Sequence, residues 1–596
     1  MQTFKRLYAL TKGNRHLYLV AVISIFMIVT ISLIPALIIS FTVDNAILGY
    51  EPITFVHRFF YNWIGPSFVR YNLWVPFVMI VSITLVRISF GYTNNRIQAI
   101  ASENMAKEMR DKLYDHLQKL PYNYHVKAQT GDLIQRVTSD VENIRNFIAA
   151  QINEMIRTLF LSIISLLVLF NLNVTLALIS SVVLPIMLIA SYIFNKKMKK
   201  AFLNQDEKEG ELFETIQENL TAVRVVRAFG RSKYELEKFT KRNDEFRDLG
   251  ARLFKIRAVY WMCSDFIGLT QIAATLVFGS IFALNGYMTV GTLMIFTLYG
   301  NNLVWPIRNL GRILADMGRM GVSLDRIDEI FNEEIEDEET HKKSPTLNAD
   351  IKFENVNFSY EDDKEVLKNL NLEIKKGETI AILGATGSGK STIMHLLLRL
   401  YDISEGNITI GDIPIKDISK KHLREKIGLV LQEPFLYSRT IEENLKMAKN
   451  IVQTEEVIKA TKTAKAHDFI ETFEKKYETM LGERGVTLSG GQRQRVAIAR
   501  TIIKHSEILI FDDSLSAVDT ETDAAIREEL GKKAENTTTI IISQRITTLK
   551  EADKIFVMEK GAITDIGTHE TLIKKEGLYK KIWDIQGMLE EEMENE

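Results

Sequence analysis

Six long apolar runs lie in the first 310 residues of this 596-residue chain, and no run of that length follows them. Each run is about as long as the ~20-residue helix that crosses a hydrocarbon layer of ~30 Å. A single run could form a buried core helix, but six in succession predict an integral membrane domain with six transmembrane helices. The runs cover approximately residues 18–41, 73–92, 155–172, 174–194, 259–284 and 288–310.

The basic residues predict how these helices are oriented. The amino terminus and the segments 95–150 and 195–258 are rich in Lys and Arg, whereas the linkers near 171–173 and 285–287 contain none. Because cytoplasmic loops carry an excess of basic residues, this pattern predicts that both termini are cytoplasmic. We therefore expect a multi-pass protein of the cell membrane, with the lipid bilayer as one of its partners.

The longer loops of this half differ in composition. The 44–72 loop is expected to be an aromatic anchor at the outer membrane surface, because it contains Phe59, Phe60, Tyr61 and Trp63. The two basic segments have a helical pattern. We expect them to continue the spans as amphipathic helices beyond the membrane, turning at Pro121–Gly131 and again near Gly210.

Five charged residues lie in or near the apolar runs. A charge inside a membrane is costly and normally faces a cavity or a partner. One interpretation is a polar translocation path, and the other is pairing between helices or a position near the interface. The sequence leaves both open for Arg87, Glu154, Arg157, Asp265 and Arg308.

Composition excludes several classes of protein. The 74 basic and 76 acidic residues give a formal net charge of −2, so we expect no nucleic-acid partner held by global charge. The single cysteine, Cys263, excludes an intrachain disulfide framework and a multi-cysteine zinc site. We expect Cys263 itself to be a small apolar core residue.

A charged stretch separates the two halves of the chain. Residues 331–349 contain six acids and few apolar side chains, which indicates a solvated linker. From residue 350 to residue 596, short β-rich runs alternate with helical ones, and this alternation predicts an α/β domain.

The strongest local motif is the glycine-rich segment Gly384-Ala-Thr-Gly-Ser-Gly-Lys-Ser391, which follows a strand-like run and precedes a helix-like one. Glycines let backbone N–H groups turn inward around phosphate oxygens at a helix amino terminus. Lys390 would neutralise the β- and γ-phosphates of ATP, and the Ser391 hydroxyl would bind Mg²⁺. The residues assigned to nucleotide binding here are Gly384, Thr386, Gly387, Ser388, Gly389, Lys390, Ser391 and Thr392.

Two further motifs support an ATP-binding domain. The apolar run Ile508-Leu-Ile-Phe-Asp512 ends in an acid, where a carboxylate serving Mg²⁺ is expected. Between the two motifs lies Leu488-Ser-Gly-Gly-Gln492, whose Ser and glycines at a helix start make a second anion-binding surface. The expected fold is an all-α membrane domain of six transmembrane helices with long cytoplasmic extensions over residues 1–330, fused to an α/β P-loop nucleotide-binding domain over 350–596.

With these motifs at these distances, the whole chain resembles a half-transporter of the ATP-binding cassette exporters, in which six spans precede one nucleotide-binding domain. The resemblance implies ATP and Mg²⁺ as ligands, with Ser391, Gln432 and Asp512 serving the metal ion. It also implies that Tyr360 stacks on adenine and that Ser489, Gly490, Gly491 and Gln492 form the signature that contacts the nucleotide of a partner subunit.

The resemblance assigns several other segments. Residues 481–485 resemble the exporter-specific loop before the signature, and 514–519 resemble the loop that crosses the dimer interface. Residues 122–131 and 209–219 resemble the two coupling helices that transmit nucleotide-driven motion to the membrane domain.

Two catalytic positions depart from the family pattern. Asp513 stands where the family usually has the Glu that polarises the attacking water, and Gln544 stands where it usually has a switch His. Asp is one methylene shorter than Glu, and a displacement of about 1 Å can cost ~100-fold in rate. Gln can donate hydrogen bonds but cannot become positively charged. The pocket is therefore expected to bind MgATP and to hydrolyse it poorly.

Because the signature is intact, the chain could complete an active pocket on a partner that carries Glu and His. This combination resembles bacterial heterodimeric multidrug exporters with a degenerate site, which implies a non-identical second subunit and a lipophilic or amphipathic cargo. Two alternatives stay open: a homodimer in which Asp513 is a slow base, and a channel-like regulatory subunit gated by ATP. A soluble ATP switch for nucleic-acid work conflicts with the six apolar runs.

Overall fold

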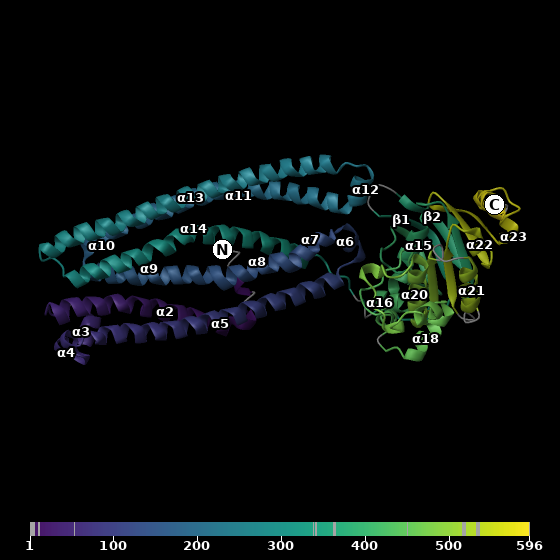
Figure 1. Ribbon diagram of the computed structural model, residues 1–596. Coiled ribbons are helices and arrows are strands. Elements are labelled where there is room, and N and C mark those ends of the chain that lie inside the picture. The colour runs from purple at the N-terminus through teal and green to yellow at the C-terminus, as the bar shows by residue number, and fades with distance from the viewer. Residues whose placement is uncertain are drawn as a thin grey trace. The chain divides into compact units, whose positions relative to one another are not determined.

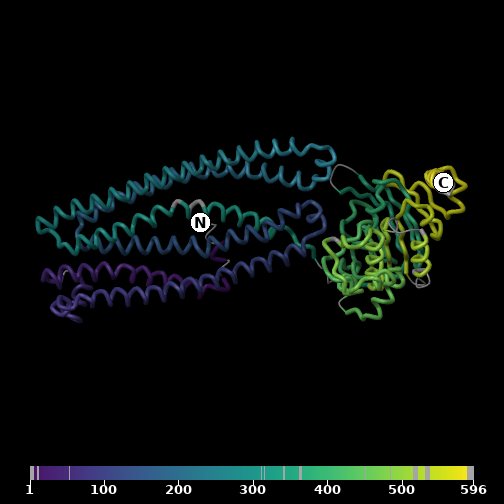
Figure 2. The backbone as a smooth tube through the Cα atoms, in the orientation of Figure 1, coloured from purple at the N-terminus to yellow at the C-terminus, as the bar shows by residue number. Residues whose placement is uncertain are grey.

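The computed structural model divides the chain into two compact units, drawn in Figures 1 and 2. The first comprises residues 1–119 with 128–334, and the second comprises 120–127 with 335–596. The structure describes residues 6–9, 12–52, 54–337, 339, 342–360, 365–449, 451–514, 520–531 and 537–594.

The first unit is helical. The longest of its helices, with 39 to 53 residues, are much longer than a membrane is thick. Helix α2 packs along α5, and α11 packs along α13 (Figure 1). The long helices are α2 (Arg15–Phe41), α5 (Trp74–Lys119), α9 (Ile152–Leu172), α11 (Val183–Thr221), α13 (Ser232–Leu284) and α14 (Val290–Asn332). Shorter elements are η1 (Lys12–Asn14), η2 (Thr42–Ile47), α3 (Phe55–Trp63), α4 (Pro66–Tyr71), α7 (Thr130–Gln135), η3 (Arg136–Asp140), α8 (Val141–Asn146), η4 (Phe147–Gln151), α10 (Val174–Ser181) and α12 (Val223–Ala228).

Five helical segments in the described residues are long and apolar enough to cross a membrane. They contain the first five apolar runs of the sequence. The sixth run, 288–310, forms the first part of α14, and its passage through the membrane stays a prediction.

The predicted turn near Gly210 is wrong. Helix α11 continues through Gly210 to Thr221, and the chain reverses only after the short helix α12. A Gly inside a helix costs only about 1 kcal/mol relative to Ala, so helix-forming neighbours can override it. The segment 209–219 is therefore part of a continuous helix, and the separate short helix in this region is α12.

The start of α14 is tied to the end of the first helix by a buried carboxylate. Asp44, which is 1% exposed, accepts hydrogen bonds from the Gly291 backbone N–H at 2.8 Å and from the Thr289 hydroxyl at 2.5 Å. Because a Cβ on Gly291 would collide with this carboxylate, only glycine fits there. The contact therefore joins the first and the last long helices of this unit.

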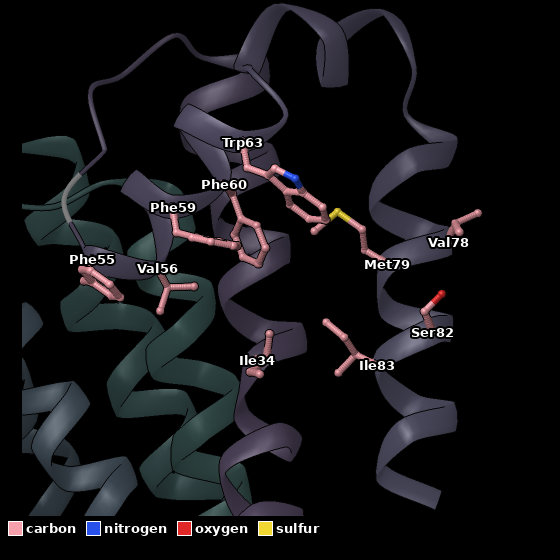
Figure 3. Close-up of a pocket in the computed structure, with 10 residues that line it drawn as sticks. All are labelled: Ile34, Phe55, Val56, Phe59, Phe60, Trp63, Val78, Met79, Ser82 and Ile83. Atoms are coloured by element: carbon pink, nitrogen blue, oxygen red, sulfur yellow. The ribbon is translucent and has the colours of Figure 1, made fainter. Parts of the chain in front are cut away.

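The aromatic loop folds into α3, whose rings line an apolar cavity of about 550 Å³ (Figure 3). Phe59 and Trp63 remain 53% and 67% exposed, as an interfacial anchor requires. The lining residues come from α2, α3 and α5 and are Ile34, Phe55, Val56, Phe59, Phe60, Trp63, Val78, Met79, Ser82 and Ile83.

The structure pairs four of the charged residues near the apolar runs. Asp265 on α13 forms an ion pair with Arg308 on α14, and Glu154 lies 3.8 Å from Arg157 within α9. Pairing between helices is therefore confirmed for Asp265 and Arg308, whereas Glu154 and Arg157 pair within one helix. The nearby Cys263 is exposed on α13, so its prediction as a core residue is wrong.

The second unit contains two sheets. The strand order in the larger sheet is β10-β9-β3-β8-β7-β6, with every neighbouring pair parallel except β10–β9. The smaller antiparallel sheet has the order β2-β1-β4-β5. The strands are β1 (Ile351–Ser359), β2 (Glu365–Ile374), β3 (Thr379–Gly384), β4 (Glu405–Ile410), β5 (Ile413–Pro414), β6 (Ile427–Val430), β7 (Ile508–Asp512), β8 (Thr538–Ile542), β9 (Lys554–Glu559) and β10 (Ala562–Gly567).

Both faces of the parallel sheet are buried. Along β3, Ala381 and Leu383 belong to one hydrophobic core, whereas Ile380 and Ile382 belong to the other. Successive side chains of a strand point to opposite faces, so an uninterrupted apolar run is expected when both faces are covered. The helices of this unit include α6 (Tyr122–Lys127), α15 (Lys390–Leu397), α16 (Lys420–Lys426), α17 (Ile441–Lys446), α18 (Thr454–Thr463), α19 (His467–Glu471), α20 (Gly490–Ile503), α21 (Thr520–Gly531), α22 (Ile546–Leu549), α23 (His569–Leu572) and α24 (Leu578–Glu594).

The 331–349 linker is less solvated than its composition predicted. Glu339 is 7% exposed and forms a two-bond ion pair with Arg399, at 2.7 and 3.1 Å. Glu336 pairs in the same way with Arg424, at 2.5 and 2.9 Å. The arginines lie far along the sequence, so the acids could not be assigned partners from composition.

We expect Glu339→Gln to lower the free energy of unfolding of the sheet unit by about 3–5 kcal/mol, because the buried Arg399 loses its buried carboxylate partner. Hydrogen exchange of this unit in the full chain measures the loss. The control is Asp402→Asn, since Asp402 contacts the same guanidinium at 3.5 Å but its side chain is 71% exposed. That change should cost less than about 0.5 kcal/mol. Equal losses would contradict the assignment.

The same pair predicts a dependence on pH. Burial alone would raise the pKa of Glu339, but hydrogen bonds from Arg399 and Lys342 outweigh it and lower the pKa from 4.5 to about 2. A depressed carboxyl pKa stabilises the fold above the unfolded pKa, and this contribution disappears as the pH falls. The difference in unfolding free energy between wild type and Glu339→Gln should therefore be constant above about pH 4.5 and shrink towards pH 2.

Candidate nucleotide-binding site

The carboxyl ends of four parallel strands meet at one edge of the larger sheet. The phosphate loop follows β3, Gln432 follows β6, Asp512 ends β7, and Gln544 follows β8. In open parallel sheets, ligands bind outside the carboxyl ends of the strands. The sheet order therefore brings together residues that are up to 160 positions apart in the sequence.

The phosphate loop has the backbone that its glycines predict. Gly387 and Gly389 have φ angles of 80° and 98°, which side chains other than glycine rarely adopt. At Gly389 a Cβ would also lie 2.7 Å from the Leu367 side chain. The buried Ser388 hydroxyl has no hydrogen-bond partner among the described residues, so a polar group remains available to a ligand inside the loop.

Lys390 lies at the start of α15 and folds back across the loop. Its Nζ donates to the carbonyl oxygens of Gly384 and Ala385, both at 2.8 Å. Burial lowers the pKa of Lys390, while the charges of Asp512 and Asp513 oppose this shift. The ammonium group is therefore held where the negative charge of bound phosphate oxygens would raise its pKa and stabilise its charged form.

Ser391 and Asp512 are already in contact. The Ser391 hydroxyl lies 3.2 and 3.1 Å from the two carboxylate oxygens of Asp512. Burial raises the pKa of Asp512, and the neighbouring charge of Asp513 adds to the rise. A bound cation would reverse this effect, because an opposite charge favours the ionised carboxylate.

These residues fit a magnesium ion. Mg²⁺ prefers oxygen ligands and is usually bound by one or two carboxylates together with substrate phosphates. Ser391 and Asp512 supply a hydroxyl and a carboxylate, and Gln432 supplies an amide at the same sheet edge. No cluster of three or more His, Cys, Asp or Glu side chains suited to a metal occurs in the described parts of the chain.

The residue at the expected catalytic position, Asp513, has an unusual backbone. Its φ angle is 43°, a left-handed conformation that Asp tolerates better than most residues, and its N–H donates to the Ile542 carbonyl at 2.7 Å. The Gln432 amide nitrogen donates to the Asp513 carboxylate at 3.3 Å. Burial raises the pKa of Asp513, which the charges of Arg545 and Lys390 oppose.

Gln544 connects the end of β8 to the phosphate loop. Its side-chain amide donates to the Thr386 hydroxyl at 3.4 Å, and its backbone carbonyl oxygen accepts from the Gln586 side-chain amide at 2.8 Å. Gln544 is therefore beside the place where a terminal phosphate would enter, and it can offer that phosphate only neutral hydrogen bonds.

Tyr360 lies beside the first turn of α15, within an aromatic cluster that sequence reasoning missed. Its hydroxyl is 2.9 Å from the Thr392 hydroxyl and 3.1 Å from Nδ1 of His395. Tyr401 packs edge-to-face on Tyr360 at 4.9 Å, and Tyr122 of α6 packs on Tyr401 at 5.7 Å. Because Thr392 and His395 are three residues apart on one helix, their spacing could have revealed the shared face.

The signature residues form the amino terminus of α20. Ser489 and Gln492 make a reciprocal capping box, at 3.3 and 2.9 Å, and Ser489 and Gly490 are exposed at the helix start. Within the described residues, no hydrogen bond or ion pair joins Ser489, Gly490, Gly491 or Gln492 to the phosphate loop. Of the segment 514–519, only Ser514 lies within the described residues.

Comparisons with known proteins agree with this geometry. Residues 17–307 match the family model for the ABC transporter transmembrane region, and residues 367–516 match the family model for the ABC transporter. The chain is 36% identical to the ABC transporter ATP-binding protein YknU of Bacillus subtilis, covering 98% of both proteins. It is 33% identical to YgaD of Bacillus subtilis, a putative multidrug export ATP-binding/permease protein, covering 86% of this chain and 89% of YgaD.

A solved structure shows the same architecture. A bacterial Atm1-family ABC exporter with ATP bound superposes with a TM-score of 0.82 at 25% identity, covering 96% of this chain and 99% of that one. The chain therefore belongs to the ABC transporter family, as an exporter half-transporter that fuses its membrane domain to its ATP-binding domain and couples transport to ATP hydrolysis.

Proposed function

We propose that this chain is one subunit of a heterodimeric exporter of lipophilic or amphipathic compounds, and that its own ATP site is degenerate. The observation that carries the proposal is the pair of residues at the two catalytic positions, Asp513 and Gln544. The chain binds MgATP through its own phosphate loop, whereas most hydrolysis takes place in a pocket built on the partner subunit.

The geometry at Asp513 supports weak hydrolysis. A general base must lie within ~2.6–3.2 Å of the proton it accepts. Asp513 starts from a strained backbone position at the end of β7 and reaches Gln432 at 3.3 Å. Its carboxylate is one methylene too short to extend as far as Glu would from the same Cα. Gln544 adds no positive charge beside the terminal phosphate, so it does not compensate for the shorter carboxylate of Asp513.

Binding does not need either group. In ATP hydrolysis a water attacks the γ-phosphorus and ADP leaves. The phosphate-loop N–H groups and Lys390 stabilise the phosphate charge, and Asp513 orients the water or accepts its proton. Bound Mg²⁺, held by Ser391, Asp512 and Gln432, would neutralise charge on the β- and γ-phosphates. Only the water-activating step is weakened by Asp513.

The intact signature supports a role in the partner's site. Ser489 caps α20 and leaves the helix start exposed, where N–H groups and the helix dipole favour an anion. A nucleotide held by another chain's phosphate loop would meet this surface. The exporter would thus contain one weak pocket and one active pocket.

Transmission to the membrane domain is assigned to two short helices. Segment 122–131 contains α6, whose Tyr122 ring lies 6.0 Å from His395. The second coupling element is α12, Val223–Ala228, in place of 209–219. We propose that both termini and the ATP-binding domain are cytoplasmic in the cell membrane. The multidrug name of the relative YgaD supports a lipophilic cargo.

The first test replaces Asp513 with Glu, whose side chain is one methylene longer. In the purified exporter complex, Asp513→Glu with Gln544→His should raise ATP turnover at this chain's pocket by about 100-fold, because a positioned general base contributes roughly 10²–10⁴. The matched control is Asp512→Glu, which adds the same methylene one residue earlier. That change should not raise turnover, because Asp512 serves the metal ion. Brisk ATP turnover in the wild-type chain alone would contradict the degenerate site.

The second test separates binding from hydrolysis. Lys390→Ala should weaken ATP binding at least about 10-fold, since hydrogen bonds to charged groups contribute about 1.5–3 kcal/mol. Lys375→Ala is the control: its lysine pairs with exposed Asp350 and Glu373 before β3, away from the phosphate loop. Unchanged affinity in Lys390→Ala, measured by equilibrium binding of a fluorescent ATP analogue, would refute the loop assignment.

A further inference from the structure

One ion pair of the membrane unit exposes its acidic end and buries its basic end. Nη1 of Arg308 on α14 donates a hydrogen bond to Oδ1 of Asp265 on α13. The Asp265 side chain is 61% exposed, whereas the Arg308 side chain is 7% exposed. The pair is therefore a dipole whose negative end points away from the packed interior of the unit.

Two tryptophan rings hold the buried guanidinium in place. Cζ of Arg308 lies 4.2 Å from the ring centroid of Trp261 and 4.4 Å from that of Trp305. The Arg308 carbonyl also accepts a hydrogen bond from the Tyr260 hydroxyl at 3.1 Å. The indole rings stabilise the positive charge of the guanidinium by cation–π attraction and hold it on the buried side of Asp265. Trp261 and Trp305 themselves remain 40% and 50% exposed.

The ion pair lies about one membrane thickness from the turn that joins the two helices. Asp265 is about 28 Å along α13 from Leu284, where the helix ends, at a rise of ~1.5 Å per residue. Arg308 is about 27 Å along α14 from Val290, where that helix begins, at the same rise. The sequence predicts that this turn lies at the outer surface, and with a hydrocarbon layer ~30 Å thick the pair is then expected near the opposite interface.

Large apolar side chains lie beside the carboxylate on the same helix. Residues spaced three or four apart share a helix face, so Trp261, Met262 and Leu269 lie on the face of Asp265. Phe266 follows Met262 by four positions in the adjoining row. The neighbouring side chains are all exposed: Trp261 at 40%, Met262 at 67%, Phe266 at 72% and Leu269 at 66%. A single negative charge therefore lies within an aromatic and aliphatic strip, which we call the Asp265 strip.

We propose that the Asp265 strip is a binding site for lipophilic cations, with Asp265 pairing with the positive charge and the apolar side chains of the strip contacting the hydrophobic body. The charge order favours a cation over an anion, because the negative group is outermost and the positive group is covered. The interfacial depth suits an amphipathic molecule, whose charged part stays near the membrane surface. The proposal rests on the lipophilic cargo of the proposed function and specifies its charge.

The test compares two probes of similar shape and opposite charge. Equilibrium binding of tetraphenylphosphonium and of tetraphenylborate is measured without nucleotide, on the exporter complex in lipid nanodiscs, with binding to empty nanodiscs subtracted. The wild-type protein should bind the phosphonium and prefer it to the borate. Asp265→Asn should weaken phosphonium binding at least about 10-fold, the usual effect of losing one charged partner.

Two further variants separate binding from folding. Asp265→Asn strands Arg308, so the double variant Asp265→Asn with Arg308→Gln removes both charges together and should also lose phosphonium affinity. Asp248→Asn is the control on α13, because Asp248 is 70% exposed, pairs with Arg247 and lies outside the apolar run. That variant should bind as the wild type does.

Three results would overturn the proposal: equal affinity for both probes, an unchanged phosphonium affinity in the double variant, or no phosphonium binding by the wild-type complex. The last result would mean that another subunit covers the strip. None of them bears on Asp513, because no nucleotide is present. Conversely, brisk hydrolysis at the chain's own site would refute the degenerate site and leave the cation site intact.

Discussion

The parallel pairing of β3, β8, β7 and β6 is the constraint on which the site depends. Parallel strands end at the same edge, so the phosphate loop, Gln432, Asp512 and Gln544 converge although they are distant in sequence. The pairing in turn requires both faces to be covered, which explains the uninterrupted apolar runs before each functional residue. A strand slipped by one residue would exchange the two cores and turn the functional side chains away from one another.

The sequence predicted the backbone placement of the motifs at this edge well, because each motif is local. The glycines of the phosphate loop, the acid that ends β7 and the capping Ser489 depend on nearby backbone and could be placed from spacing. Predictions failed where the outcome depended on distant partners. Glu339 was expected in solvent because its partner, Arg399, is 60 residues away. The continuation of α11 through Gly210 depends on the balance between one glycine, which weakly disfavours a helix, and its helix-forming neighbours.

Prediction of the membrane unit was limited in the same way, by contacts between residues that are distant in sequence. Long apolar runs predicted the helices, but the face of each charged residue could not be read from one sequence. The structure places Arg308 inside and Asp265 outside, and packs Arg308 against two tryptophans from different helices. That asymmetry converts an ordinary interhelical pair into a candidate recognition site. It also explains how an arginine can be kept in an apolar region, since cation–π contacts and one carboxylate share its charge.

The proposed function divides the roles between two subunits. In that proposal this chain supplies a nucleotide clamp and a signature surface, and a second, different chain supplies the efficient base. The most direct test is the intact mass of the complex purified from native membranes through a tag on this chain, with the bound nucleotides identified. The account predicts two different subunits with ATP retained unhydrolysed in one pocket. A mass equal to two copies of this chain, with ADP in both pockets, would contradict it.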